Sequence, residues 1–515
     1  MRLEEHLETM ASRSPNRAAL IADEGRLTYR ELDDAAARHA ALFAACGVIS
    51  GDRVVLCVDN SLEAVSALYG VLKAGAAFCL VNPATKAGKL ARIAERLRAK
   101  VLVIHQRLLP AANELQDVPG LVAMYVAGPN PNASAPRLSD AVAQQGEAKC
   151  DRGGIDLDLA YVSFTSGSTG EPKGVMMTHQ NANAAVSSIN TYLRSSEDDV
   201  VLSALPLSFS YGLYQVLCSV MCGGTVILER DFAYPQKFLQ RLSSDCVTGF
   251  PVVPTMVSLI LGLKNLADVS APQLRYITNA AAALSPAHGK RLRELFPKAD
   301  LFAMYGMTEC VRGTYLNPAE YDQHPLSVGQ AIPNTEAWIV SENGEPVAPG
   351  EVGELVIRGA NVMAGYWEDP VATEAVVRRG RHSWERVLWT GDLFRRDPEG
   401  RLYHVARKDD LIKTRGEKVS PKEVEDILYQ MPQIAEAAVI GSPDPVFGSI
   451  VKAFIVPVEE SELTVRQVQQ HCAAQLEDYM VPRAVEFRMS LPKTASGKIR
   501  KAELRKEAEA VKKVI

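Results

Sequence analysis

Residues 163–174 read SFTSGSTGEPKG, a run of Ser, Thr and Gly that carries one lysine, Lys173. The preceding DLDLAYV favours a strand, and the following VMMTHQNANAAVSSI favours the opening of a helix. Glycines let the backbone approach an anion closely, and hydroxyl and N–H groups donate hydrogen bonds to it. The run does not match G-x-x-x-x-G-K-[ST], because Gly174 follows the lysine. It indicates a phosphate-binding loop of another kind, with a plain surface loop as the alternative on these residues alone.

Segments on both sides of this loop alternate apolar strand patterns with helical ones. Strand patterns occur at 52–59, 76–82 and 101–106, helical patterns lie between them at 61–75 and 88–99, and the alternation resumes from about 200 to 310. Helices between short apolar strands are typical of parallel sheets with right-handed crossovers. The sequence therefore predicts an α/β fold with a large N-terminal domain of parallel sheets.

The pattern changes twice further along the chain. From about 325 to 408, short alternating runs punctuated by NG and PG turns predict an antiparallel β subdomain. From 409 to 515, helical and strand patterns mix over a length that suits a small separate domain. A chain of 515 residues is too long for one ordinary core. We therefore expect an N-terminal domain at 1–408 and a small α+β C-terminal domain at 409–515.

Composition narrows the class of protein. A formal net charge of -5 and a pI near 6.1 call for neither a nucleic-acid partner nor an anionic membrane. No apolar run reaches the roughly 18 residues that span a bilayer, and the acidic start MRLEEHLETM does not resemble a signal peptide. The nine cysteines are scattered without a CxxC pair, which argues against a disulfide framework or a zinc site. A reducing, cytoplasmic location is expected.

Further motifs follow the loop in order along the chain. They are MYGMTE (304–309), GELVIRG (353–359), GYW (365–367), LWTGDLFRRDPEGRLYHVARKDD (388–410), LIKTRGEKVSPKEVE (411–425) and PKTASGKIRK (492–501). Together with the loop, they resemble the signature motifs of the AMP-forming adenylating superfamily, which includes acyl- and aryl-CoA synthetases, carrier-loading adenylation domains and luciferases. The resemblance covers nearly the whole chain.

The resemblance implies a ligase that works in two half-reactions. A carboxylate attacks the α-phosphorus of Mg²⁺·ATP and releases pyrophosphate, and a thiol then attacks the acyl-adenylate and releases AMP. Such chemistry depends on positioning and on charge neutralisation. ATP and Mg²⁺ are the expected cofactors, and a small carboxylic acid is the expected substrate.

The same resemblance assigns the nucleotide site. The β- and γ-phosphates are expected against Thr165, Ser166, Gly167, Ser168, Thr169, Gly170 and Lys173. Glu309 is the expected metal ligand, because Mg²⁺ takes one or two carboxylates with phosphate oxygens and water. Thr308 is expected at the α-phosphate and Tyr305 on adenine. Asp392 and Arg407 are expected at the ribose, where a carboxylate accepts hydroxyl hydrogen bonds.

The C-terminal motifs imply a moving catalytic lysine. Lys498 matches the family's lysine in position, with Lys493 and Lys501 as rivals nearby. Its ammonium is expected to bridge the substrate carboxylate and the α-phosphate. Asp409 matches the hinge about which the C-terminal domain turns between the two reactions. The segment expected to turn towards the incoming thiol includes Lys413, Gly416 and Lys418.

The acid is less well determined. LPLSFSYGL (205–213) has Phe209 where many acyl-CoA synthetases have His, and Ser210 where amino-acid adenylation domains usually have Asp. A buried ammonium without a carboxylate partner is costly, so an α-amino acid is disfavoured. The other expected pocket positions, Asn279, Ala280, Ala281, Gly306 and Met307, are mostly small and neutral, which favours an uncharged acyl or aryl group. Arg312 could pair with a second anionic group or face solvent.

Three functions stay open on the sequence. In the first, coenzyme A accepts the acyl group. In the second, the phosphopantetheine arm of a separate carrier protein accepts it, and the chain contains no carrier domain of its own. No extra segment lies between LWTGD and RKDD, so both half-reactions are expected. The third is a nucleotide-binding protein without catalysis, against which Thr308, Glu309, Asp392 and Lys498 argue.

Overall fold

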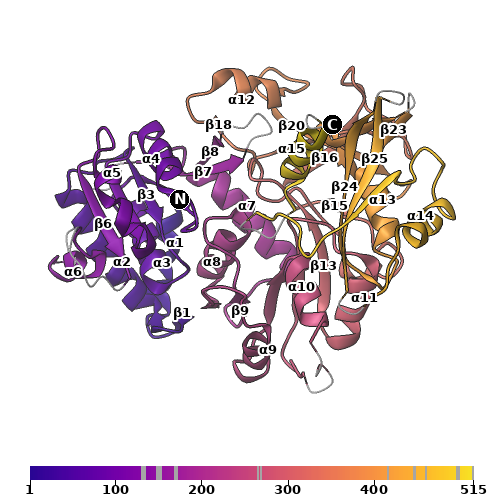
Figure 1. Cartoon of the computed structure of the whole chain (residues 1–515). Coiled ribbons are helices and arrows are strands. Elements are labelled where there is room, and N and C mark those ends of the chain that lie inside the picture. The colour runs from indigo at the N-terminus through magenta and orange to yellow at the C-terminus, as the bar shows by residue number, and fades with distance from the viewer. Residues whose placement is uncertain are drawn as a thin grey trace.

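The computed structural model describes most of the chain (Figure 1). The described residues are 1–512 without 129–134, 147–153, 167–171, 264–265, 267–268, 415–416, 445–447, 459–460 and 495–498. The chain forms two large sheets, a smaller antiparallel sheet and a C-terminal α/β unit. The resulting mixed α/β architecture has the fold class expected from the sequence.

A seven-stranded sheet forms the first layer, in the order β18-β8-β7-β4-β3-β5-β6. Its strands are β3 (Arg53–Cys57), β4 (Ala77–Val81), β5 (Val101–His105), β6 (Ala123–Ala127), β7 (Leu159–Ser166), β8 (Pro172–Thr178) and β18 (Gly365–Tyr366). The strands from β3 to β7 pair in parallel, whereas β8 pairs antiparallel with β7 and with β18. The buried runs VVLC and FCLV explain the central position of β3 and β4.

A nine-stranded sheet forms the second layer, in the order β15-β14-β13-β12-β11-β9-β10-β1-β2. Its strands are β1 (Ala18–Ala22), β2 (Gly25–Thr28), β9 (Val200–Ser203), β10 (Thr225–Leu228), β11 (Gly249–Val252), β12 (Tyr276–Asn279), β13 (Asp300–Tyr305), β14 (Thr314–Tyr315) and β15 (Gln330–Ala331). Neighbours between β1 and β13 pair in parallel. Because parallel strands end at the same edge, the residues after β12 and β13 lie close together.

Helices cover these sheets. Before β8 they are α1 (Leu3–Arg13), α2 (Tyr29–Ala45), α3 (Leu62–Lys73), α4 (Ala87–Arg96), α5 (Ala112–Gln116) and α6 (Leu138–Ala143), with the 3₁₀ helix η1 (Gln106–Ala111). After it come α7 (His179–Leu193), α8 (Ser210–Cys222), α9 (Pro235–Ser244), α10 (Pro254–Leu261), α11 (Pro286–Leu295), η2 (Pro318–Glu320) and α12 (Pro370–Val376). One hydrophobic core joins the two sheets and the antiparallel subdomain.

The segment after residue 163 differs from the sequence-based expectation. The strand β7 is followed by the antiparallel strand β8, with Thr165 opposite Lys173, and the helix α7 begins only at His179. Thr178 caps that helix by accepting from the backbone N–H of Asn181, and the Asn181 side chain accepts from the N–H of Thr178. The helix predicted within VMMTHQNANAAVSSI therefore begins four residues later than expected, because its N-cap is Thr178, the last residue of VMMT.

The antiparallel subdomain expected at about 325–408 is present. Its five-stranded sheet contains β16 (Thr335–Val340), β17 (Gly353–Gly359), β19 (Val377–Arg379), β20 (Arg386–Arg396) and β21 (Leu402–Arg407). All pairs in this sheet are antiparallel. The pairing of β20 with β21 sets Asp392 directly opposite Arg407.

The remaining chain forms its own small cores. The hairpin β22 (Ile412–Thr414) and β23 (Glu417–Val419) follows η3 (Lys408–Asp410), and the sheet β24-β25-β26 contains Ile434–Asp444, Gly448–Pro457 and Ala484–Phe487. The helices are α13 (Pro421–Leu428), α14 (Val465–Ala473) and α15 (Lys501–Lys512). The helical sequence pattern TVRQVQQHCAAQLEDYM runs to Met480, but α14 ends seven residues earlier, at Ala473. The two clusters of buried residues here lie between Ile412 and Ala508.

Candidate active site

The hairpin of β7 and β8 presents the Gly/Ser/Thr run. Its described part, Thr165 and Lys173, forms a cross-strand pair, whereas Gly167, Ser168, Thr169 and Gly170 lie outside the described residues, as does the side chain of Ser166. Neighbouring elements fix the base of the hairpin. The Arg96 guanidinium donates to the carbonyl of Pro172 at 2.8 Å, and the Trp367 indole donates to the carbonyl of Arg96 at 2.9 Å.

Glu309 follows β13 and is buried, with 8% of the residue exposed. The Tyr366 hydroxyl, on β18, donates to Glu309 Oε1 at 2.8 Å. Burial raises the pKa of the Glu309 carboxyl, and the Tyr366 hydrogen bond opposes that rise. The Lys173 ammonium lies 5.0 Å from the centre of the Tyr366 ring. Tyr366 therefore contacts both the predicted phosphate lysine and the predicted metal ligand.

A second carboxylate lies on the antiparallel subdomain. Asp392 is buried on β20, where its Oδ2 accepts from the Tyr305 hydroxyl at 2.6 Å. The Arg407 guanidinium contacts Asp392 Oδ1 at 2.9 Å. The predicted adenine and ribose residues thus form one hydrogen-bonded group. The ring of Tyr305 also packs edge-on against Phe394, with centroids 4.9 Å apart.

Several predicted substrate residues gather near this group. Phe209 and Ser210 are half-buried at the start of α8, and Asn279 and Ala280 are buried at the end of β12. Gly306 and Met307, which are half-buried, follow β13, the parallel neighbour of β12. A Cβ at Gly306 would lie 2.3 Å from the carbonyl oxygen of Val311, so this turn needs glycine. Ala281 differs from the others because it is exposed and has a φ of 70°.

Arg312 does not face solvent. Only 3% of the residue is exposed, and its guanidinium lies 5.0 Å from the centre of the Tyr211 ring. The solvent-facing alternative considered for this arginine was therefore wrong. The Asn361 amide holds the turn by donating to the carbonyls of Cys310 and Arg312, each at 2.9 Å.

The C-terminal lysines differ in their contacts. Lys493 pairs with Glu436, and Lys501 pairs with Glu425 at 2.6 Å, so both rivals of Lys498 are ion-paired inside the C-terminal unit. Lys498 and Gly416 lie outside the described residues, as does the side chain of Lys418. Lys413 is exposed on β22.

The expected hinge lies in η3. Asp409 is the middle residue of this short helix. On one side of it, Lys408 contacts Glu354 of β17 at 3.3 Å. On the other side, Asp410 pairs with Arg505 of α15 at 2.6 Å.

The residues around Glu309 fit a magnesium ion that would be bound jointly by the protein and by the phosphates of a nucleotide. Among the described residues no group of three or more His, Cys, Asp or Glu side chains could hold a metal by itself. Glu309 offers one buried carboxylate whose raised pKa marks an environment that favours a neutralising partner. A single carboxylate completed by phosphate oxygens and water is the arrangement that Mg²⁺ commonly takes.

Comparison with known proteins identifies the family of this chain. The family model "AMP-binding enzyme" matches residues 7–367, and the model "AMP-binding enzyme C-terminal domain" matches residues 423–498. The chain belongs to the AMP-binding enzyme family. The predicted superfamily and the predicted enzyme class, an AMP-forming acid–thiol ligase, are thereby confirmed, with ATP and coenzyme A as the substrates of the family.

Named relatives of this AMP-binding enzyme act on different acids. The chain is 33% identical to a long-chain-fatty-acid–CoA ligase of Escherichia coli O157:H7, over 94% of this chain and 90% of the relative. It is 31% identical to an indoleacetate–CoA ligase of Aromatoleum aromaticum, over 98% of both chains. A crystal structure of an anthranilate CoA ligase with anthranoyl-AMP superposes with a TM-score of 0.91 and 27% identity, covering 99% of this chain and 97% of the other.

Sequence reasoning missed several residues of this AMP-binding enzyme. Tyr366 and Trp367 belong to the GYW motif, which was noticed without a role for either side chain. Arg96 and Asn361 had no local signal, because their partners lie far away in the sequence. No helix in the described part of the chain combines the length and the apolar character needed to cross a membrane.

Proposed function

We propose that the protein joins a small carboxylic acid to coenzyme A through an acyl-adenylate. In the first step, a carboxylate oxygen attacks the α-phosphorus of ATP, and the bond to pyrophosphate breaks. In the second step, the coenzyme A sulfur attacks the acyl carbon. AMP leaves with the electron pair of the acyl–oxygen bond, and the thiol proton passes to solvent.

The contact chain Lys173–Tyr366–Glu309 carries this proposal. A cation and a carboxylate on separate segments meet at one tyrosine, with 5.0 Å from Lys173 Nζ to the ring centre and 2.8 Å from the hydroxyl to Glu309. Asp392 and Arg407 lie near enough to influence the pKa of Glu309. A triphosphate needs this mixture of cation, metal-binding carboxylate and ribose acceptor within one site.

The residues take the following roles in the proposal. Residues 165–170 and Lys173 hold the leaving pyrophosphate, and Thr308 donates to the α-phosphate. Asp392 and Arg407 bind the ribose, and the Tyr305 ring lies against adenine. Glu309 would bind Mg²⁺, which when bound neutralises phosphate charge.

Lys498 acts in the first step of the proposal. Its ammonium stabilises the negative charge that builds between the carboxylate and the α-phosphate. The ion pairs of Lys493 and Lys501 support this choice, because those two ammonium groups are already held by glutamates of the C-terminal unit. Rotation at Asp409 then brings Lys413, Gly416 and Lys418 towards the thiol.

Exchange of labelled pyrophosphate into ATP, measured across a panel of fatty, aryl and amino acids, tests the first step. Exchange that depends on the acid is expected, and Lys498→Ala should lower it by at least about 100-fold, the scale of a lost transition-state charge contact. The matched control is Lys493→Ala, which removes a part-exposed ion pair and should change the rate by less than about fivefold. If no acid supports exchange, or if both variants behave alike, the assignment fails.

The second step is tested by supplying either coenzyme A or a phosphopantetheine-loaded carrier protein. We expect the acyl product on coenzyme A, identified by mass spectrometry. If turnover occurs with the carrier protein and not with coenzyme A, the protein is instead a free-standing enzyme that loads a carrier protein. ATP binding without any pyrophosphate release would instead show a nucleotide-binding protein without catalysis.

A further inference from the structure

Arg312 is a buried cation with no acidic partner among the described residues. It is 3% exposed, and no ion pair joins it to an aspartate or glutamate in the part of the chain that the structure describes. Its Nε is buried and has no hydrogen-bond partner there. The ring of Tyr211 lies 5.0 Å away and offers a cation–π contact. Such a contact offsets only part of the free energy that burying a guanidinium costs.

The fold holds this arginine in place with some strain. Val311, immediately before it, has a φ of 63°, which is rare for a β-branched residue. The Asn361 amide fixes the carbonyls on either side of that residue, at Cys310 and Arg312. The Tyr211 hydroxyl is fixed in turn by Thr278, at 2.8 Å from the carbonyl oxygen. Strained residues held in this way concentrate at binding sites.

Arg312 also lies at the active-site end of the large sheet. It follows Glu309 by three residues, on the turn after β13. Tyr211 belongs to α8, which begins at the predicted pocket residue Ser210, and Thr278 precedes the predicted pocket residue Asn279. Arg312 therefore belongs to the turn at the sheet edge where the body of the acid is expected.

The space behind Arg312 is small and closed. A cavity of about 20 Å³ lies between α7, α8 and the sheet, and Arg312, Tyr211, Thr278 and Asp199 are among the residues that line it. It has room for roughly one water molecule. Four tyrosines fill its walls: Tyr192, Tyr211, Tyr214 and Tyr276. This cavity has no room for an acyl chain that extends beyond Arg312, so a compact acid that ends at the guanidinium fits better.

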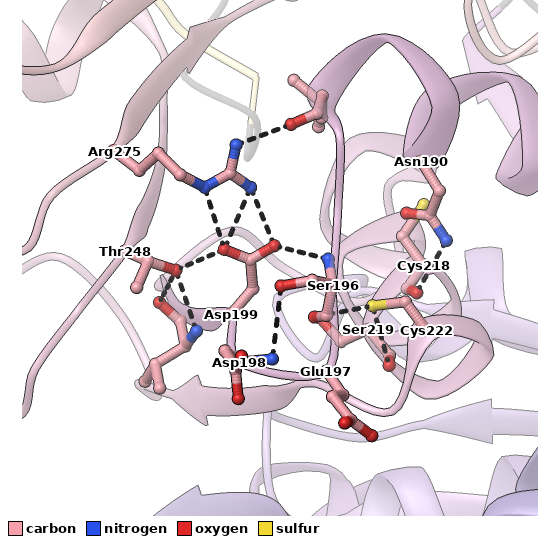
Figure 2. A network of polar contacts seen from close by, with 12 residues as sticks. Asn190, Ser196, Glu197, Asp198, Asp199, Cys218, Ser219, Cys222, Thr248 and Arg275 are labelled. Atoms are coloured by element: carbon pink, nitrogen blue, oxygen red, sulfur yellow. Dashed lines mark hydrogen bonds and ion pairs between the residues drawn. The ribbon is translucent and has the colours of Figure 1, made fainter.

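Asp199, which lines this cavity, belongs to a polar network with Arg275 and Thr248 (Figure 2). Asp199 accepts from the Arg275 guanidinium at 2.8 Å and from the Thr248 hydroxyl at 2.8 Å. These residues immediately precede β9, β12 and β11, so they lie at the edge opposite the active site. Asp199 is thus already engaged by Arg275 and does not neutralise Arg312.

We propose that Arg312 determines the specificity of the enzyme by binding a second carboxylate of a compact acid substrate. The proposal rests on the proposed ligase function and refines its substrate class from an uncharged acid to a dicarboxylic acid. One carboxylate reacts with ATP, and the other pairs with the guanidinium over Tyr211. A carboxylate at this position supplies the negative partner that the buried guanidinium lacks. The planar guanidinium can donate two parallel hydrogen bonds to the two oxygens of a carboxylate.

The test compares short diacids with monoacids of the same carbon count, in aliphatic and aromatic pairs, by acid-dependent pyrophosphate exchange. In the wild-type enzyme we expect at least about tenfold higher kcat/KM for the diacid of the preferred pair. Arg312→Met should remove that preference by lowering the diacid rate while leaving the monoacid rate within about threefold, and Arg312→Lys should keep part of the preference.

The matched control is Arg293→Met, since Arg293 also lies over a tyrosine ring, at 6.0 Å from Tyr321, but on α11 and away from the site. Equal use of diacid and monoacid by the wild type overturns the proposal, and this comparison needs no variant to fold. If Arg312→Met lowers the exchange rate with the diacid and with the monoacid equally, the proposal is also overturned, because the arginine then has only a packing role. Absence of exchange with every acid would instead reject the proposed ligase function.

Discussion

The Tyr366 hydroxyl donates a hydrogen bond to Glu309, with 2.8 Å between the two oxygens. The carboxylate belongs to the turn after β13 and the tyrosine to β18, which pairs with β8 of the hairpin proposed to bind phosphate. One hydrogen bond thus connects the two sheets at the proposed metal position.

Tyr366→Phe should lower kcat/KM for pyrophosphate exchange by about 10- to 100-fold, because a hydrogen bond to a charged group contributes roughly 1.5–3 kcal/mol. The lost hydrogen bond should also raise the pKa of Glu309 further, since burial already raises it and Tyr366 opposes that rise. The acidic limb of the pH–rate profile should therefore move to higher pH. Tyr321→Phe is the control, because the buried Tyr321 hydroxyl has no partner among the described residues. If the acidic limb does not move in Tyr366→Phe, the Tyr366 hydroxyl does not control the pKa of Glu309.

Asp392→Asn should weaken ATP binding by about tenfold, or roughly 1.4 kcal/mol. The change removes the charge opposite Arg407 and alters the acceptor of the Tyr305 hydroxyl. Isothermal titration calorimetry with ATP measures the effect. Asp397→Asn is the matched control, because Asp397 pairs with Arg401 at 2.8 Å on the turn between the same two strands. Equal weakening in both variants would place the ribose elsewhere.

Lys408→Met should change the ratio between the adenylation rate and the thioester-forming rate by up to about fivefold, the scale of a part-exposed ion pair. Lys408 contacts Glu354 at 3.3 Å and precedes the proposed hinge residue Asp409. Single-turnover assays of each half-reaction give the ratio. Lys422→Met removes a pair with Asp426 inside α13 and should leave the ratio unchanged. A constant ratio in Lys408→Met would mean that this contact does not bias the rotation.

Glu4→Gln should stabilise the protein more at about pH 8 than at about pH 5.5. Burial raises the pKa of Glu4 to about 7, so the folded protein keeps a proton that the unfolded chain releases near pH 4.5. The folded state then binds more protons, and stability falls as pH rises from about 4.5 to about 7. Glutamine cannot ionise and avoids that loss, which is on the order of 1–3 kcal/mol.

Thermal unfolding of wild type and Glu4→Gln at both pH values provides the measurement. Nearby His179, at 3.7 Å from Glu4, has its pKa lowered to about 4 by burial, so it stays mostly neutral at both. A difference in Tm between the two proteins that is the same at both pH values would show that Glu4 does not release a proton in this range.

The parallel sheets could be predicted because their strands carry continuous apolar runs. VVLC in β3 and FCLV in β4 are buried along their length, and the helix α3 separates them. Such patterns are local and need no knowledge of partners. The family resemblance also located Glu309, Asp392 and Lys173, each of which lies in a recognisable motif.

Contacts between distant segments could not be predicted. The strand β8 was taken for the start of a helix, because its pairing with β7 and β18 decides its conformation more than its own residues do. The choice between a buried and a solvent-facing Arg312 stayed open for a similar reason, since its burial depends on Tyr211 and Asn361, which lie far from it in the sequence. A charged residue in isolation favours the surface.

The pairing of β18 with β8 restricts how this family member can evolve. Tyr366 pairs with Val175, and a shift of one residue in either strand would turn the tyrosine to the opposite face of the sheet. An insertion within 172–178 would therefore separate the hydroxyl from Glu309. Variation in length is compatible with the site only outside the paired strands.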